Sequence, residues 1–175
     1  MSPDAADDVE SILVPIDGSD AATAALETAL SLAETAGASV HVLAVVDVES
    51  GPLRFDTDFV TDLEDARRRL LEEVRSEYGD RTVPVTGSIR RGVPARAILR
   101  EASERDVDLI VLGRSGATGI VAPLLGSTTA RVLRRATVPV LVAPGEDESG
   151  TDASNSRTPS RSGGVGPGVD PSTDP

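Results

Sequence analysis

The stretch Ser11–Asp20, which reads SILVPIDGSD, decides the fold. Its first six residues are almost continuously apolar, as is typical of a parallel strand that is covered on both faces. The Asp-Gly-Ser that follows breaks the strand, and Ser19 or Asp20 can cap the next helix. Apolar side chains then recur at helical spacing up to Gly37, a typical helix C-cap. The chain therefore opens with a strand–helix unit.

The same unit recurs along the rest of the chain. Further apolar runs predict strands at residues 39–46, 83–89, 107–112 and 138–143. Amphipathic segments predict helices that begin near Asp58, Pro94 and Ser127, the last of them extending through Ala136. Strands that alternate with helices imply parallel neighbours joined by right-handed crossovers. We therefore predict an α/β three-layer sandwich, with a five-stranded parallel sheet and helices on both faces.

The composition limits what this domain can bind. The chain of 175 residues has a net charge of -12, and its 17 basic residues are all arginine. They lie among Asp and Glu, and we expect Arg67, Arg68, Glu72 and Glu73 of the second helix to face water. A nucleic-acid binder needs a concentrated basic face, so we expect no nucleic-acid partner. An acidic surface also suits a high-salt cytoplasm, such as that of a halophilic archaeon, which we take as a hypothesis. The absence of lysine has an alternative explanation, because a high-GC genome would also replace Lys by Arg.

The remaining composition sets the compartment and the domain limits. The absence of cysteine excludes thiolate catalysis and Cys-ligated metals, and the single histidine, His41, is expected to be a satisfied strand residue. No signal peptide and no membrane-spanning run is recognisable, so we expect a cytoplasmic protein without membrane contact. We expect a short acidic segment at residues 1–9, a folded domain at 10–144 and a disordered acidic Gly/Ser/Pro tail at 145–175.

Two segments at predicted strand ends have the residue types of a phosphate site. Asp17-Gly18-Ser19 follows the first strand, and Gly113-Arg114-Ser115-Gly116 follows the fourth and leads to Gly126-Ser127 at a helix start. Ligands of open α/β sheets bind at the carboxyl ends of strands, and glycine lets the backbone approach a phosphate closely. Free N–H groups at a helix start favour an anion. The alternative interpretation is that Asp17 only caps a helix and the glycines only form loops.

Four segments of the chain resemble the universal stress protein family. Gly113-x2-Gly116-x9-Gly126-Ser127 resembles the ATP-binding signature G-x2-G-x9-G-(S/T) of that family. The opening ILVPIDGSD is similar to its first strand, Gly92-Val93-Pro94 to the segment before its third helix, and the ending VPVLVAP to its last strand. The resemblance implies the universal stress protein fold, related to adenine nucleotide α-hydrolases. Its sheet is ordered 3-2-1-4-5, with ATP between strands one and four.

The resemblance also implies the residues that contact ATP. Those at the adenosine lie at the ends of the first two strands: Pro15, Ile16, Asp17 and Val45. Those at the ribose and phosphates follow the fourth strand and begin the fourth helix: Leu112, Gly113, Ser115, Gly116, Gly126, Ser127, Thr128 and Thr129. Some members of the family have His where Ser115 stands, and serine is a smaller donor. A Mg2+ or Mn2+ ion would be held by the phosphates.

The function implied by the resemblance is that of a regulatory or protective stress-response protein that binds ATP and forms a homodimer through Val138–Ala143. The position of this strand at the sheet edge gives a second reason, because an exposed apolar edge strand tends to associate unless it is covered or paired. One alternative is a slow ATPase or nucleotidyl-transfer enzyme, although no HIGH-like or SGGxDS-like motif occurs and only Asp20 could supply a base near the phosphates. A third possibility is a nucleotide-free interaction protein, against which the intact glycine signature argues.

Overall fold

The computed structural model describes residues 9–47, 57–114 and 125–144, in which strands and helices alternate as the sequence predicts. The elements in chain order are β1 (Ser11–Ile16), α1 (Asp20–Ala36), β2 (Ser39–Val46), α2 (Thr57–Tyr78), β3 (Val85–Arg91), α3 (Pro94–Glu104), β4 (Leu109–Gly113), α4 (Ser127–Leu133) and β5 (Val140–Ala143). The predicted acidic segment before residue 9 and the predicted tail lie outside the described residues.

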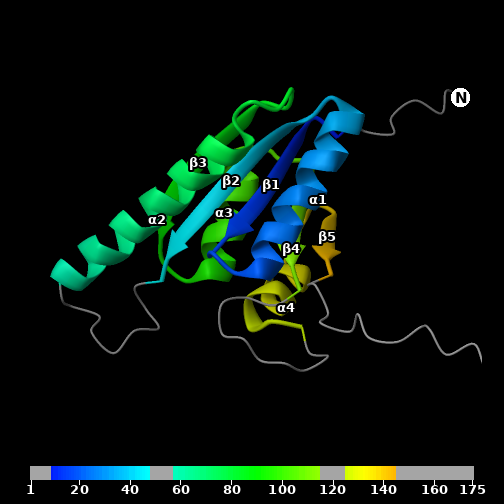
Figure 1. Ribbon diagram of the computed structural model, residues 1–175. Coiled ribbons are helices and arrows are strands. Elements are labelled where there is room, and N and C mark those ends of the chain that lie inside the picture. Colours follow the sequence, from blue (N-terminus) through cyan, green and yellow to red (C-terminus); the bar gives the residue numbers. More distant parts are fainter. Residues whose placement is uncertain (1–8, 48–56, 115–124, 145–175) are drawn as a thin grey trace, which may run out of the picture.

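The strands form one parallel sheet with the order β3-β2-β1-β4-β5. Helices α1 and α2 cover one face of this sheet, while α3 and α4 cover the other (Figure 1). The three-layer sandwich and the strand order 3-2-1-4-5 are thus confirmed. Because β1 has β2 on one side and β4 on the other, the strand order reverses between β1 and β4, which is where open α/β sheets bind ligands.

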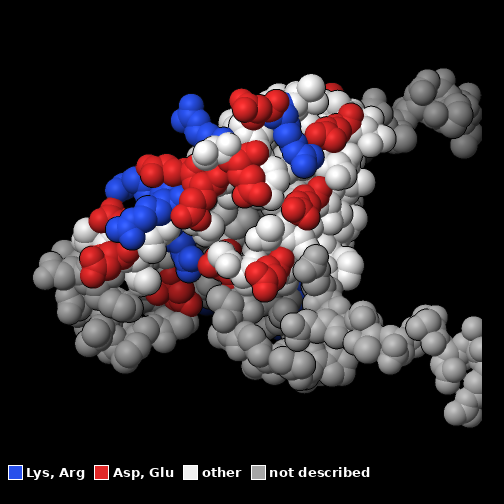
Figure 2. Space-filling view, viewed as in Figure 1, with Lys and Arg blue, Asp and Glu red and all other residues white. Residues whose placement is uncertain are grey.

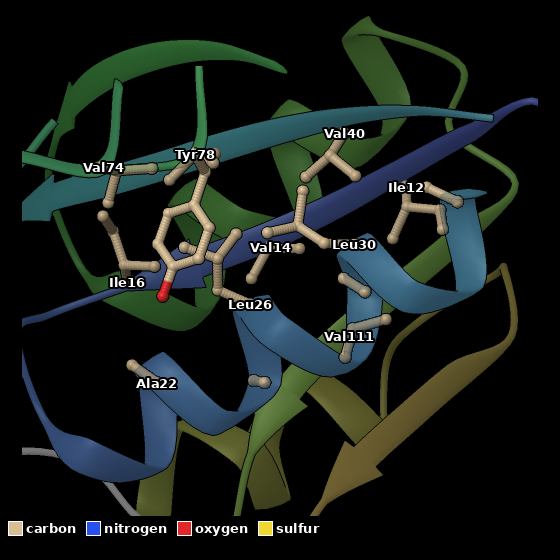
Figure 3. Packing of buried hydrophobic residues seen from close by; sticks show 14 of the residues in the cluster. Ile12, Val14, Ile16, Ala22, Leu26, Leu30, Val40, Val74, Tyr78 and Val111 are labelled. Atoms are coloured by element: carbon tan, nitrogen blue, oxygen red, sulfur yellow. The ribbon is translucent and has the colours of Figure 1, made fainter. Parts of the chain in front are cut away.

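Two aliphatic cores hold the helices against the sheet. On the α1–α2 face, Leu26 and Leu30 of α1 and Val74 and Tyr78 of α2 pack over the central strands (Figure 3). The strand residues of this core are Ile12, Val14, Ile16, Val40, Val42, Ala44, Val111 and Ala143. The α3–α4 face buries the alternate strand residues, among them Leu13, Leu43 and Ile110, against Ile98 and Val132. A strand buried on both faces has no polar side, which explains the continuous apolar runs of β1 and β2.

Several element ends differ from the sequence prediction. β4 begins at Leu109 rather than at residue 107, and just before it the carboxylate of Asp108 accepts hydrogen bonds from the N–H groups of Glu10 and Ser11. β5 begins after Pro139, which lacks an N–H for the ladder. β3 covers residues 85–91 instead of 83–89, and α4 ends at Leu133. The start of β4 thus depends on partners that are distant in the sequence.

The surface mixes charges of both signs. On the face shown in Figure 2, arginines lie among Asp and Glu side chains. Among the described residues, Arg68 pairs with Asp65 at 2.7 Å and Arg81 with Glu34 at 3.1 Å. In the described part of the chain, no helix combines the length and apolar character needed to cross a membrane.

Candidate functional site

The fold brings the two glycine-bearing segments to the same edge of the sheet. β1 and β4 pair in parallel, with Ile12 opposite Leu109 and Leu13 opposite Ile110. Their carboxyl ends therefore point the same way, at the position where the strand order reverses. The turn after β1 and the end of β4 are about a hundred residues apart in the sequence but belong to neighbouring strands.

The turn after β1 is built around Asp17 and Ser19. Oδ1 of Asp17 accepts hydrogen bonds from the N–H of Ser19 at 3.0 Å and from its hydroxyl at 2.6 Å. The Ser19 hydroxyl in turn accepts the N–H of Ala22 at 3.2 Å and so caps α1. Gly18 has a φ of +88°, a backbone conformation that L side chains rarely adopt. Asp17 therefore does not cap α1 itself but holds the capping Ser19 through one carboxylate oxygen, and its contact with a ligand stays a prediction.

Gly113 lets β4 approach the first turn of α1. A Cβ at this position would lie 2.5 Å from the carbonyl oxygen of Ala21 and 2.7 Å from its carbonyl carbon. The hydroxyl of Thr129, a buried side chain of α4, donates a hydrogen bond of 2.9 Å to the Gly113 carbonyl. Gly113 and Thr129 therefore join β4, α1 and α4, which is a packing role that the sequence signature did not indicate. Ligand contact from either residue stays a prediction.

The segment between β4 and α4 is closed by main-chain hydrogen bonds. The N–H of Gly126 donates to the carbonyl of Arg114 at 2.8 Å, and the N–H of Arg114 donates to Ala143 of β5 at 3.2 Å. Gly126 is also the N-cap of α4, and no side chain caps that helix. Ser127 is exposed and Thr128 is half-buried at its start. The predicted site residues Ser115 and Gly116 lie outside the described residues.

The other predicted adenosine and ribose contacts have their side chains turned into the fold. Ile16 belongs to the α1–α2 core, whereas Val45 and Leu112 belong to the α3–α4 core. All three are buried, and Pro15 is half-buried. Contacts from the three buried residues to a ligand would therefore come from main-chain groups.

Arg67 of α2 is a residue of this edge that the sequence analysis missed. It was expected to face water, but its side chain is half-buried and reaches the strand ends. Its Nε donates to the carbonyl of Val45 at 3.2 Å, and its Nη1 donates to the carbonyl of Asp17 at 2.9 Å. Long arginine stems can cover apolar surface while the guanidinium reaches polar groups. The signal was present, since Arg67 lies in the inward helical register between Leu63 and Leu70.

A second group of polar side chains lies between the sheet and α3. Glu101, which is 0% exposed, accepts hydrogen bonds from Arg105 at 2.6 Å, from Arg90 at 2.5 Å and from Ser88 at 2.8 Å. Its Oε1 is 3.1 Å from Nε2 of His41. Nε2 of His41 also lies 2.8 Å from the Ser88 hydroxyl. The expectation that His41 is a satisfied strand residue is confirmed, whereas its partner Glu101 was not foreseen.

These contacts shift two pKa values downward. Burial by itself raises the pKa of Glu101, but hydrogen bonds from Arg105, Ser88 and Arg90 outweigh it and lower the pKa to about 2. Burial, followed by the positive charge of Arg105, lowers the pKa of His41 below 6.5, against the opposing effect of Glu101. At neutral pH the group therefore combines a buried carboxylate with a neutral imidazole and two guanidinium groups.

Comparisons with known proteins agree on one family. The model of the universal stress protein family matches residues 9–144. Universal stress protein MJ0531 of Methanocaldococcus jannaschii is 33% identical over 135 residues, which cover 75% of this chain and 79% of that relative. The solved structure of MJ0577 has a TM-score of 0.71 at 28% identity and covers 80% of this chain and 99% of its own. A universal stress protein solved in complex with cAMP has a TM-score of 0.58 at 25% identity, with coverages of 78% and 97%.

Proposed function

This chain belongs to the universal stress protein family, and we propose that it is an ATP-binding regulatory or protective protein of the stress response. One observation carries the proposal: the ends of β1 and β4, where the sequence predicted the ligand segments that begin at Asp17 and Gly113, lie on neighbouring strands where the strand order reverses. A relative with 25% identity has been solved in complex with cAMP, which supports an adenine nucleotide as the ligand.

In this proposal the adenosine lies over the carboxyl ends of β1 and β2, near Asp17 and the main chain of Val45. The ribose and phosphates follow the segment from Gly113 to Thr128, where α4 begins without a side-chain cap and its first N–H groups favour an anion. Thr129 would help to position this segment, because its hydroxyl donates a hydrogen bond to the Gly113 carbonyl. A Mg2+ or Mn2+ ion would be held by the phosphates, and no group of three or more His, Asp or Glu in the described ranges could hold a metal ion.

The test of this function is nucleotide binding by the full chain. We expect ATP to bind more tightly than GTP in calorimetry, because main-chain groups and Asp17 would read the adenine edge. Hydrolysis should remain far below the roughly 10 per second of a median enzyme, since the site offers positioning but no evident group to orient water.

Each alternative has its own outcome in that experiment. A chain that binds neither ATP nor cAMP at millimolar concentration would favour the nucleotide-free interaction protein. A turnover near the median rate that is lost in Asp17→Ala would favour the enzyme.

We also propose that the protein forms a homodimer through Val138–Ala143. β5 is an edge strand of the sheet, and Val140, Leu141 and Val142 are only half-buried in the single chain. An unpaired apolar edge favours association, and a two-fold axis there would set the same residues against each other. Such a dimer would keep the site at the opposite side of β4 accessible to the nucleotide.

Replacing Leu141 by Arg should convert the dimer to a monomer, because two like charges would face each other across the axis. Light scattering after size exclusion measures this, in high salt that suits a chain of net charge -12 and again at lower salt, where the repulsion between the two arginines is screened less. The matched control is Ser31→Arg, which adds the same charge on the exposed face of α1 and should stay dimeric. A wild-type monomer at micromolar concentration, or a folded Leu141→Arg dimer, would contradict this interface.

A further inference from the structure

The guanidinium of Arg67 spans the ends of two neighbouring strands. Its Nε donates to the carbonyl of Val45, at the end of β2, at 3.2 Å. Its Nη1 donates to the carbonyl of Asp17, just after β1, at 2.9 Å. The side chain comes from α2, a third element, and reaches both carbonyls. Arg67 therefore connects three elements at the edge where the two glycine-bearing segments meet.

The geometry of the contact fixes these strand ends relative to each other. A guanidinium is planar and its donors have fixed directions, so two hydrogen bonds to two carbonyls define both their separation and their orientation. The hydrogen bond from Nη1 to the Asp17 carbonyl also ties the turn after β1 to α2.

We propose that Arg67 is a positioning residue of the nucleotide site, which holds the Asp17 and Val45 main chain in the arrangement that receives the nucleoside. The inference rests on the proposed function, and it assigns Arg67 to the adenosine half of the ligand rather than to the phosphates. Its contribution is geometric, because both of its described hydrogen bonds go to neutral carbonyls. A geometric contribution acts on a neutral nucleoside as strongly as on ATP, whereas a contribution of charge acts on ATP alone.

The experiment compares ATP and adenosine binding to full-length variants. Calorimetry gives the ATP affinity, and displacement of ATP by adenosine gives the nucleoside affinity. We expect Arg67→Ala to weaken both by the same factor of about ten, the effect expected for losing hydrogen bonds from a charged donor. Arg67→Lys should stay closer to alanine than to wild type, because an ammonium group cannot reproduce the two-point contact.

The matched control is Arg68→Ala, one residue along the same helix. Arg68 is exposed and pairs with Asp65 on α2 itself, so its removal should leave both affinities unchanged. All titrations are made well below the melting temperature, where a change in stability alone would not alter the affinities. If Arg67→Ala fails to fold, the ATP and adenosine affinities of Arg67→Lys are compared with those of the wild type instead, and weaker binding of both ligands is the expected result.

Four results would overturn the inference. Unchanged binding in Arg67→Ala would show that the contact is irrelevant to the ligand. Weaker ATP binding with unchanged adenosine binding, or full rescue by lysine, would show that the charge matters and the geometry does not. If adenosine fails to displace ATP from the wild type, the site does not bind the nucleoside by itself, and a role of Arg67 in nucleoside binding is refuted. A wild type that binds no ATP would instead refute the proposed function, and this inference with it.

Discussion

Replacement of Glu101 by leucine should lower the free energy of unfolding by about 3 kcal/mol, as expected for breaking a buried ion pair. The carboxylate is fully buried and accepts hydrogen bonds from Arg105, Arg90 and Ser88. Leucine fills the space but leaves the Ser88 hydroxyl and the imidazole of His41 without their shared partner. We expect the low end of the range for buried pairs, because the two arginine side chains are 39% and 43% exposed and can turn to water.

The same carboxylate should make the protein sensitive to acid. The folded-state pKa of Glu101 is about 2, below the 4.5 of an unperturbed glutamate. A lowered folded-state pKa stabilises the protein fully above the unfolded-state value, and this stability is lost as the pH falls from about 4.5 towards 2. A shift of this size corresponds to roughly 3 kcal/mol. The lowered pKa of His41 acts with the same sign and begins to remove stability below about 6.5.

Urea unfolding at a series of pH values measures both effects. Glu101→Gln should flatten the dependence of the unfolding free energy on pH between about 4.5 and 2. The control is Glu104→Gln on the same helix, whose carboxylate pairs with Arg90 and Arg100 but is 39% exposed. Surface pairs contribute little, so this control should behave nearly as wild type. An unchanged pH profile in Glu101→Gln would show that the buried carboxylate does not stabilise the fold as described.

Replacement of Gly126 by valine should weaken ATP binding by at least about a hundredfold, which is a loss of about 2.7 kcal/mol. The branched side chain would stand at the start of α4, where the proposal locates the phosphates. The fold should tolerate the change, since Gly126 has a φ of -56° and a ψ of 147°, which any residue can adopt. Its N–H would still donate to Arg114. Calorimetry with ATP measures the loss, and circular dichroism checks the fold.

Two controls separate a steric effect at the phosphates from a general disturbance. Gly126→Ala adds one methyl group and should reduce the ATP affinity less than valine does. Adenosine, which has no phosphates, should bind to Gly126→Val nearly as to wild type. Equal ATP affinities in wild type and a well-folded Gly126→Val would place the phosphates elsewhere.

The sequence alone determined the architecture, because the relevant signals are local. The continuous apolar runs of β1 and β2 predicted both strands with their observed ends. Gly37 was recognised as the C-cap of α1, and Ser19, one of two candidates, is its N-cap. The repetition of this unit implied a parallel sheet, and the family resemblance added the strand order. The two segments of the candidate site were also found by local chemistry, since glycines and helix-capping residues interrupt the pattern at strand ends.

Only the tertiary structure decided which side chains act across elements. Arg67 was expected to face water and Glu101 was not singled out from the sequence, yet Arg67 reaches two strand ends and Glu101 is fully buried beside two arginines. Gly113 read as a ligand glycine, but its Cβ would collide with Ala21 of α1. The physical reason is the same in each case. The hydrophobic period of a helix or strand predicts which way a side chain faces. The residue that this side chain contacts depends on the packing of segments that are distant in the sequence.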